Sequence, residues 1–218
     1  MSTPANLSDL IARLADNKYV LGRRFSEWTN GAPTLEAAVA AAAMTQDEVG
    51  QARSLYAALQ GLPDSPEAYV LDAPRKRDHL LRLAVPALDK PFESWADFVA
   101  ASVLFDRALT MVFEAARASS FEPLRQRAVK ILQEERFHRM YGEGWLKRWA
   151  AASPKARAAM QAALDRLWGP TADWLGSIYN GGLVAEGVVA DDPEAVRVRW
   201  AAEAGRLLAG HGLTAPGA

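Results

Sequence analysis

Apolar residues recur at spacings of three and four along most of the chain, and prolines and glycines separate the segments that show this repeat. The repeat is that of an amphipathic α-helix, in which such positions share one face. No segment alternates apolar and polar residues over the length of a strand. The pattern therefore predicts an all-α protein, with long helices over residues 6–29, 34–61, 94–118, 123–151, 154–179 and 192–209.

Local signals mark the starts of several of these helices. Ser94 is followed three residues later by Asp97, which resembles a capping box. Ser153 and Asp192 each precede a proline, the arrangement of an N-cap followed by a proline at the first helical position. The stretch between the second and third long helices is irregular, and we expect two short helices within residues 65–83.

The order of the long helices predicts their architecture. The first four form two pairs, each pair with a short internal turn, and one long crossover joins the pairs. This matches a four-helix bundle of the ferritin-like kind. The helices over 154–179 and 192–209 would pack outside the bundle as accessory helices. No linker or change in composition marks a boundary, so we expect one domain over residues 1–218.

Polar residues interrupt the apolar stripe of each bundle helix near its middle. A charge on a buried stripe is costly unless it is paired or bound to a metal. Each interruption lies roughly 11 to 14 residues from a helix end or a connecting turn, which places all of them at a similar height in the bundle. We therefore expect one buried polar cluster, formed by Lys18, Glu48, Gln51, Asp106, Glu135 and His138.

The residue types in this cluster point to a metal site that has lost ligands. Di-iron carboxylate bundles take a carboxylate from each of two helices and a Glu-x-x-His pair from each of the other two. Here Gln51 stands where the second histidine belongs, and Lys18 stands where a carboxylate belongs. An ammonium group at that position neutralises carboxylates by ion pairing instead of iron. The expected site is vestigial or holds a single metal, with the remaining ligands Glu48, Asp106, Glu135 and His138.

Two simpler interpretations remain open for these residues. Glu135 and His138 can form a surface pair one helical turn apart, and the ammonium of Lys18 can reach solvent along the bundle surface. The matching interruptions on all four helices favour the buried cluster. None of these residues is assigned a catalytic role.

Composition and charge narrow the functional classes. Half of the 218 residues are hydrophobic and 23% are charged, which is typical of a soluble globular protein. The formal net charge of -1 favours neither nucleic acid nor a strongly basic partner. The chain has no cysteine, which excludes disulfides, thiolate metal ligands and a cysteine nucleophile. It shows no membrane-spanning apolar run and no signal-peptide pattern, so we expect a cytoplasmic protein without a membrane contact.

Short segments along nearly the whole chain, to about Pro216, together resemble a known family. Their order and spacing resemble the phenylacetyl-CoA epoxidase (ring 1,2-monooxygenase) system of bacterial phenylacetate degradation, and above all its C-type, structural subunit. The segments are LADNKYVL (14–21), SEW (26–28), APTLE (32–36), VGQAR (49–53), LFD (104–106), EERFH (134–138), LW (167–168) and VRW (198–200).

The resemblance implies a ferritin-like fold and a non-catalytic role in phenylacetate catabolism. In that family a homologous A subunit holds the di-iron centre and the acyl-CoA substrate, and a separate reductase supplies electrons. The resemblance thus implies stable pairing of this chain with an A subunit. It implies no cofactor on this chain beyond a weakly bound iron or other divalent metal.

A departure from the C-type pattern keeps a second function open. Residues 46–51 read Gln-Asp-Glu-Val-Gly-Gln and resemble the Gln-Asp-Glu-x-Gly-His of the catalytic subunit. The chain also keeps Glu48 and Glu135, where C-type chains often carry apolar residues. The alternative is a divergent metal-binding ferritin-like oxidase or oxygenase that is active by itself. Iron storage is disfavoured because no ferroxidase set is complete, and a homodimer in isolation remains an alternative to the heteromer.

Overall fold

The chain is built of helices, and the computed structural model describes residues 7–60, 62 and 84–216. The elements are α1 (Leu7–Ser26), α2 (Leu35–Ala58), the 3-10 turn η1 (Pro86–Leu88), α4 (Trp95–Ala100), the π-helix η2 (Ala101–Asp106), α5 (Arg107–Ala115), α6 (Glu122–Ala152), α7 (Pro154–Ser177), α8 (Gly181–Ala185) and α9 (Pro193–Ala209). No strand occurs in these residues, and the all-α class is confirmed. The two short helices predicted within 65–83 lie outside the described residues.

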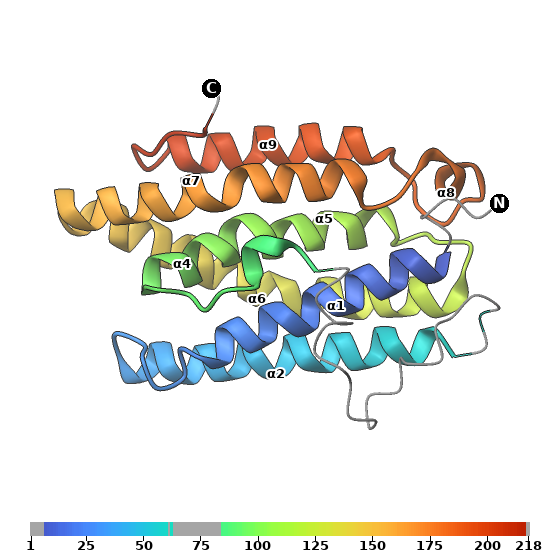
Figure 1. Cartoon of the computed structure of the whole chain (residues 1–218), viewed down its shortest axis with the longest axis horizontal. Coiled ribbons are helices and arrows are strands. Elements are labelled where there is room, and N and C mark those ends of the chain that lie inside the picture. Colours follow the sequence, from blue (N-terminus) through green and yellow to red (C-terminus); the bar gives the residue numbers. More distant parts are fainter. Residues whose placement is uncertain (1–6, 61, 63–83, 217–218) are drawn as a thin grey trace.

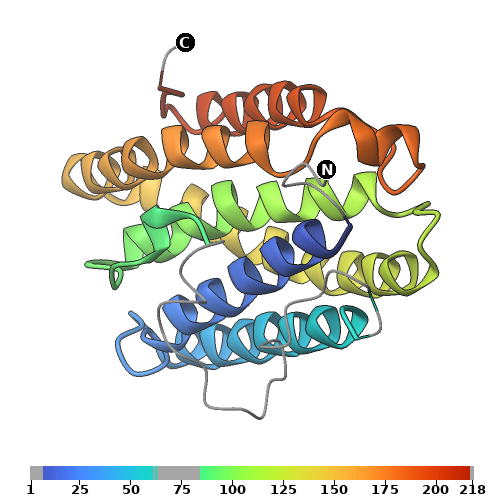
Figure 2. The same ribbon diagram turned by 45° about the vertical axis from the view of Figure 1, so that its right-hand side comes forward.

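The long helices form a bundle with one added layer, as Figures 1 and 2 show. Helices α1 and α2 pack side by side, and the continuous run α4–η2–α5 lies over α6 to complete the bundle. Helix α7 packs against α4, η2 and α6, and α9 covers α5 and α7. The prediction of a ferritin-like bundle with two accessory helices is therefore confirmed. The six predicted long helices begin within one residue of their predicted starts and end within three residues of their predicted ends.

The residues predicted to cap helices form capping hydrogen bonds. The Asp97 carboxylate accepts a hydrogen bond from the backbone N–H of Ser94 at 2.9 Å. The Ser153 hydroxyl oxygen accepts from the backbone N–H of Ala156, and the Asp192 carboxylate caps α9 in the same way. These contacts satisfy N–H groups that have no partner within the helix itself.

The third bundle helix departs from the prediction of one regular α-helix over 94–118. Its central residues Ala101–Asp106 form the π-helix η2, in which each backbone hydrogen bond spans one residue more than in an α-helix. The indole Nε1 of Trp200 on α9 donates to the carbonyl oxygen of Leu104 at 2.9 Å, inside this wider segment. The accessory layer thus satisfies a backbone group in the irregular turn. The short helix α8 was not predicted.

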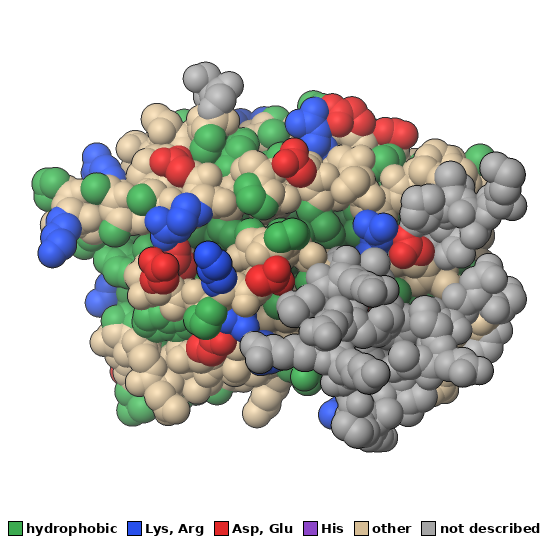
Figure 3. Space-filling view, viewed as in Figure 1, with side chains coloured by type: hydrophobic (Ala, Val, Ile, Leu, Met, Phe, Trp, Pro, Cys, Tyr) green, Lys and Arg blue, Asp and Glu red, His purple; other side chains and the backbone are tan. Residues whose placement is uncertain are grey.

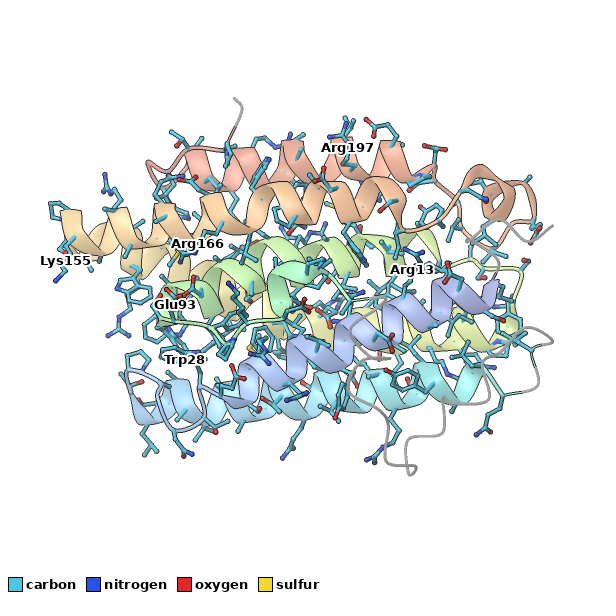
Figure 4. The ribbon with its side chains drawn as sticks, in the orientation of Figure 1. Arg13, Trp28, Glu93, Lys155, Arg166 and Arg197 are labelled. Atoms are coloured by element: carbon cyan, nitrogen blue, oxygen red, sulfur yellow. The ribbon has the colours of Figure 1, made fainter. Side chains whose placement is uncertain are left out.

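Aromatic side chains close the end of the bundle where α1 turns into α2. Trp28, labelled in Figure 4, lies at this turn and packs edge-on against Trp95, with 5.8 Å between ring centroids. Trp95 in turn stacks on Phe98 at 4.3 Å and meets Trp145 of α6 at 5.3 Å. These rings join the α1–α2 turn to α4 and α6 through contacts that add to the ordinary burial of apolar surface.

The surface has a mixed charge pattern. Acidic and basic side chains are interspersed on the face shown in Figure 3. None of the described helices combines the length and apolar character required to span a membrane.

Helices α1 and α2 approach each other closely at Gly22. A Cβ atom at this position would lie 2.9 Å from the Cβ of Glu48 and 3.0 Å from a methyl group of Val49. Real Cβ atoms do not come this close to a neighbouring stem, so only glycine permits this spacing. Gly50, on the partner helix, has no heavy atom within 4 Å of such a Cβ.

We predict that Gly22→Ala lowers the free energy of unfolding by about 1–3 kcal/mol, because the two helices must shift apart. Gly50→Ala meets no neighbour and should leave stability unchanged or raise it by up to about 1 kcal/mol, since alanine favours helix. Denaturant unfolding of both variants and the wild type measures the difference. Equal stability of the two variants would contradict the close approach.

Candidate functional site

Polar side chains from all four bundle helices meet in the protein interior. Lys18 comes from α1, Glu48 from α2, and Asp106 from the last residue of η2. Glu135 and His138 both come from α6, one turn apart. All five are buried, with at most 3% of any residue exposed. We call these five residues the ion cluster.

The ammonium group of Lys18 lies at the centre of the ion cluster. Its Nζ donates to Glu48 Oε1 at 3.0 Å, to Asp106 Oδ1 at 2.8 Å and to Glu135 Oε1 at 2.8 Å. All three ammonium hydrogens therefore have a carboxylate acceptor. The side chain is 0% exposed, so it does not reach solvent as the simpler interpretation allowed.

His138 links the ion cluster to the outside of α2. Its Nδ1 lies 3.1 Å from Asp106 Oδ2 and 3.3 Å from Glu48 Oε1. Its Nε2 lies 3.3 Å from Oδ2 of Asp47, whose side chain is 43% exposed. Burial alone lowers the pKa of His138, but hydrogen bonds to Asp106, Asp47 and Glu48 outweigh it and raise the pKa above its usual range. These contacts favour the imidazolium form, which can donate from both ring nitrogens.

Burial and mutual charge set the protonation of the other four groups. Burial lowers the pKa of Lys18, but the facing carboxylates outweigh it and raise the pKa well above its usual value. Burial raises the pKa of Asp106, but Lys18 and His138 outweigh it and hold that pKa below its usual range. Burial and the neighbouring Asp106 raise the pKa of Glu48 to about 8, and they also raise that of Glu135. Three carboxylates face two cations, and a proton on Glu48 removes the excess negative charge.

The structure places Gln51 beside the ion cluster rather than in it. Its Nε2 donates to Glu134 Oε2 at 3.1 Å, and its Oε1 has no hydrogen-bond partner among the described residues. The sequence pattern predicted Gln51 as a member of the cluster, and this placement corrects that prediction. The Lys18 ammonium, and not the Gln51 amide, donates to the three carboxylates of the ion cluster.

Two residues that contact the ion cluster, Thr110 and Asp47, were not predicted from the sequence as part of the site. The Thr110 hydroxyl lies 3.2 Å from Glu135 Oε2 and 2.9 Å from the carbonyl oxygen of Asp106. Thr110 is four residues after Asp106, a spacing that keeps both on one helix face. Asp47, which contacts His138, is the second of these residues. It is four residues before Gln51, so the same helical spacing places it on the side of α2 that faces α6.

A cavity reaches the ion cluster from the side of the accessory layer. It has a volume of about 500 Å³ and lies between η2, α5, α6 and α9. Asp106, Glu135 and Thr110 line its inner part, and Val103, Ala204 and Leu207 supply apolar walls. The ion cluster therefore has an approach from solvent although its members are buried.

The side chains of the ion cluster offer atoms that can bind a metal ion, but the Lys18 ammonium occupies the space between them. Glu48, Asp106, Glu135 and His138 each offer one ligand atom, and these atoms lie within 4.8 Å of one another. Carboxylate oxygens with an imidazole are donors that suit iron and similar divalent ions. The Lys18 ammonium, however, lies within 3.0 Å of all three carboxylates and takes the place among them that a cation would need. With this side chain in position the residues do not fit a pair of metal ions.

The fold and the site together define a class of protein. A helical bundle of this arrangement, with carboxylates and a Glu-x-x-His pair from facing helices at one height, belongs to the ferritin-like class, and here a lysine lies at the centre of the polar cluster.

Comparison with known proteins identifies the family within this class. The chain belongs to the family of phenylacetic acid catabolic proteins, whose model it matches over residues 2–218. It is 31% identical over 194 residues to the C subunit of the 1,2-phenylacetyl-CoA epoxidase of Escherichia coli (strain K12), covering 88% of this chain and 76% of the relative. The resemblance found in the sequence is confirmed, and the homology supports a role in phenylacetate catabolism.

We predict that Lys18→Met lowers the free energy of unfolding by about 3–5 kcal/mol, because it leaves buried carboxylates without their cation. Lys130→Met makes the same chemical change on α6, where the side chain is 77% exposed, and should stay within about 0.5 kcal/mol of the wild type. Denaturant unfolding at neutral pH measures both. A small loss for Lys18→Met would mean that the ion pairs do not support the fold.

The raised pKa of Glu48 links the stability of the protein to pH. The folded protein keeps the Glu48 proton up to about pH 8, whereas the unfolded chain releases it near the ordinary pKa of 4.5. The raised pKa therefore contributes stability that is complete below pH 4.5 and is lost as pH rises to about 8. Glu48→Gln has no proton to lose, so we predict that its stability relative to the wild type increases across this interval. Parallel pH profiles of unfolding free energy for the two proteins would contradict the assignment.

Proposed function

We propose that this chain is a non-catalytic structural subunit of a multicomponent phenylacetyl-CoA epoxidase. It pairs with a homologous subunit that carries the di-iron centre, and it supports that subunit in its active shape. The single observation that carries the proposal is the Lys18 ammonium, bound to three carboxylates where a metal site would be expected. The homology to a chain named as one lettered subunit of an epoxidase supports an assembly of several subunits.

The ion cluster suits a structural role for a physical reason. Lys18 joins α1 to acidic residues on α2, η2 and α6, and His138 adds a second cation from α6. A covalently attached ammonium cannot be lost, chelated or oxidised as an iron ion can. The bundle therefore keeps the geometry of its iron-binding relatives whatever the iron supply, which is a useful property in a subunit whose task is to hold a partner.

The same ammonium argues against oxygen chemistry on this chain. It has no redox states and no exchangeable coordination position. The inner oxygens of Glu48, Asp106 and Glu135 accept hydrogen bonds from it, so these oxygens are engaged in ion pairs. A further oxygen, Glu135 Oε2, accepts from Thr110.

A second candidate function is favoured by one specific observation. Four ligand atoms from Glu48, Asp106, Glu135 and His138 lie within 4.8 Å of one another, and a cavity reaches Asp106 and Glu135. If Lys18 moved aside, this set would hold one divalent ion. The alternative is therefore a divergent metal-dependent oxidase or oxygenase. Metal content separates the two functions.

We predict that protein purified from iron-supplemented cells contains far less than one iron per chain. Lys18→Glu combined with Gln51→His restores the missing ligand types and should raise iron affinity by more than about tenfold. The matched control is Lys155→Glu with Gln133→His, which makes the same changes at exposed positions on α7 and α6. Near-stoichiometric paired iron in the wild type, with the absorption of a bridged di-ferric centre, would overturn the proposal.

The melting temperature provides a second test, which remains informative if the variant with Lys18→Glu and Gln51→His is poorly folded without metal. Lys18→Glu removes the central cation, so the variant should become dependent on metal for stability. Its melting temperature should rise when ferrous iron is added without oxygen, while that of the wild type stays constant. A wild-type melting temperature that rises equally would favour the metal-binding alternative.

A further inference from the structure

The cavity beneath α9 has the size of a small-molecule site. Its volume of about 500 Å³ falls within the usual range of ligand pockets, roughly 300–1,000 Å³. Residues of η2, α5, α6 and α9 line it, so its walls belong to packed helices and not to loops. Such walls hold their side chains in fixed positions, and the chemistry of the lining therefore indicates which kind of molecule fits.

The charged side chains in the cavity wall already have partners of opposite charge. The Arg107 guanidinium donates to Glu114 at 2.7 Å and to Glu203 at 2.8 Å. The Arg139 guanidinium donates to Glu143 at 2.8 Å. These ion pairs neutralise the wall, so it offers no spare charge to a ligand.

The charges at the inner end of the cavity are compensated as well. Asp106 and Glu135 each accept a hydrogen bond from Lys18 at 2.8 Å, and Thr110 donates to the second oxygen of Glu135. The remaining charged residue of the lining, Arg206, is exposed and therefore solvated. A charged ligand would lose its hydration without gaining a free counter-charge inside the cavity, which is unfavourable. The lining thus favours an uncharged ligand.

One buried polar group of the lining lacks a partner. Ser102 is only 3% exposed, and its hydroxyl forms no hydrogen bond with any described residue. A buried hydroxyl without a partner is unfavourable, and a ligand that brings a hydrogen-bonding group removes this cost. Val103, Ala204 and Leu207 add apolar surface to the same cavity. The lining therefore suits a molecule with one polar group on an apolar body.

We propose that this cavity binds a small uncharged molecule that carries a hydroxyl group on an apolar body. The hydroxyl pairs with that of Ser102, and the apolar body packs against Val103, Ala204 and Leu207. The inference goes beyond the proposed function, because it concerns a ligand of this chain alone and requires no partner subunit.

Occupation of the cavity would also act on the ion cluster. Asp106 and Glu135 line the cavity and belong to the ion cluster. An apolar body beside these carboxylates keeps water away from their ion pairs with Lys18, which strengthens the pairs. A ligand that binds only the folded chain also raises the melting temperature.

The test is calorimetric titration of the full chain with three probes that share a six-carbon body. The probes are 1-hexanol, hexanoate and hexylammonium, and the last two carry opposite charges at neutral pH. We expect saturable binding of 1-hexanol and at least about tenfold weaker binding of both charged probes, because the cavity leaves their charge uncompensated.

A variant that fills the cavity locates the binding. Ala204→Phe places a large side chain in the cavity and should weaken 1-hexanol binding by more than about tenfold. Ala202→Phe is the matched control, because it makes the same change at an exposed position on the same helix. The melting temperature of each variant checks that it is folded.

Ser102→Ala tests the hydroxyl contact and remains informative if Ala204→Phe does not fold. It removes a hydroxyl that has no partner in the protein, so the fold should tolerate it. We expect 1-hexanol to bind about two- to tenfold more weakly to this variant, which is the effect of one lost hydrogen bond. Binding of 1-chlorohexane, which has no hydroxyl, should not change.

Each outcome decides a part of the proposal. Weaker binding of 1-hexanol by Ala204→Phe, with Ala202→Phe unaffected, supports the site. No saturable binding of 1-hexanol, or equal binding by the wild type and a folded Ala204→Phe variant, overturns the site. Tighter binding of either charged probe overturns the uncharged class of ligand. An unchanged affinity of Ser102→Ala for 1-hexanol overturns the contact with this hydroxyl.

Discussion

The positive charge of Lys18 among three buried carboxylates is the interaction on which the rest of this structure depends. Carboxylates in a protein interior are strongly unfavourable unless a cation compensates them. Each of the three comes from a different segment, so compensating them fixes α1, α2, η2 and α6 at one height. The imidazolium of His138 and a proton on Glu48 complete the charge balance. The bundle is thus held at its centre by charges that all belong to the chain itself.

This arrangement connects the interior with two parts of the surface. On one side, Glu135 and Asp106 line a cavity beneath α9. On the other side, His138 contacts Asp47 at the seam between α2 and α6, where apolar side chains are exposed. In the function that we propose, the Lys18 ammonium takes the place of a metal ion in the interior, and the bundle supports a partner subunit from outside.

Much of the fold followed from the sequence, because helical periodicity and capping residues are local signals. The convergence of the ion cluster also followed, since the height of Lys18 or Asp106 in a bundle depends only on its distance from a turn. The π-helix η2 was missed because a wider turn leaves the apolar spacing almost unchanged, and its stabilising contact comes from Trp200, some 96 residues away in sequence. The side-chain direction of Gln51 was also missed, because the competing hydrogen bond to Glu134 crosses between helices.

The central claim is that an ammonium group takes the place of a metal ion, and one measurement tests it most directly. Crystals grown without oxygen and with excess ferrous iron can be examined by anomalous diffraction at the iron absorption edge. We expect no anomalous peak between Glu48, Asp106 and Glu135, and continuous density from the Lys18 side chain to their shared centre. An iron peak at that centre, with the Lys18 side chain displaced, would contradict the claim.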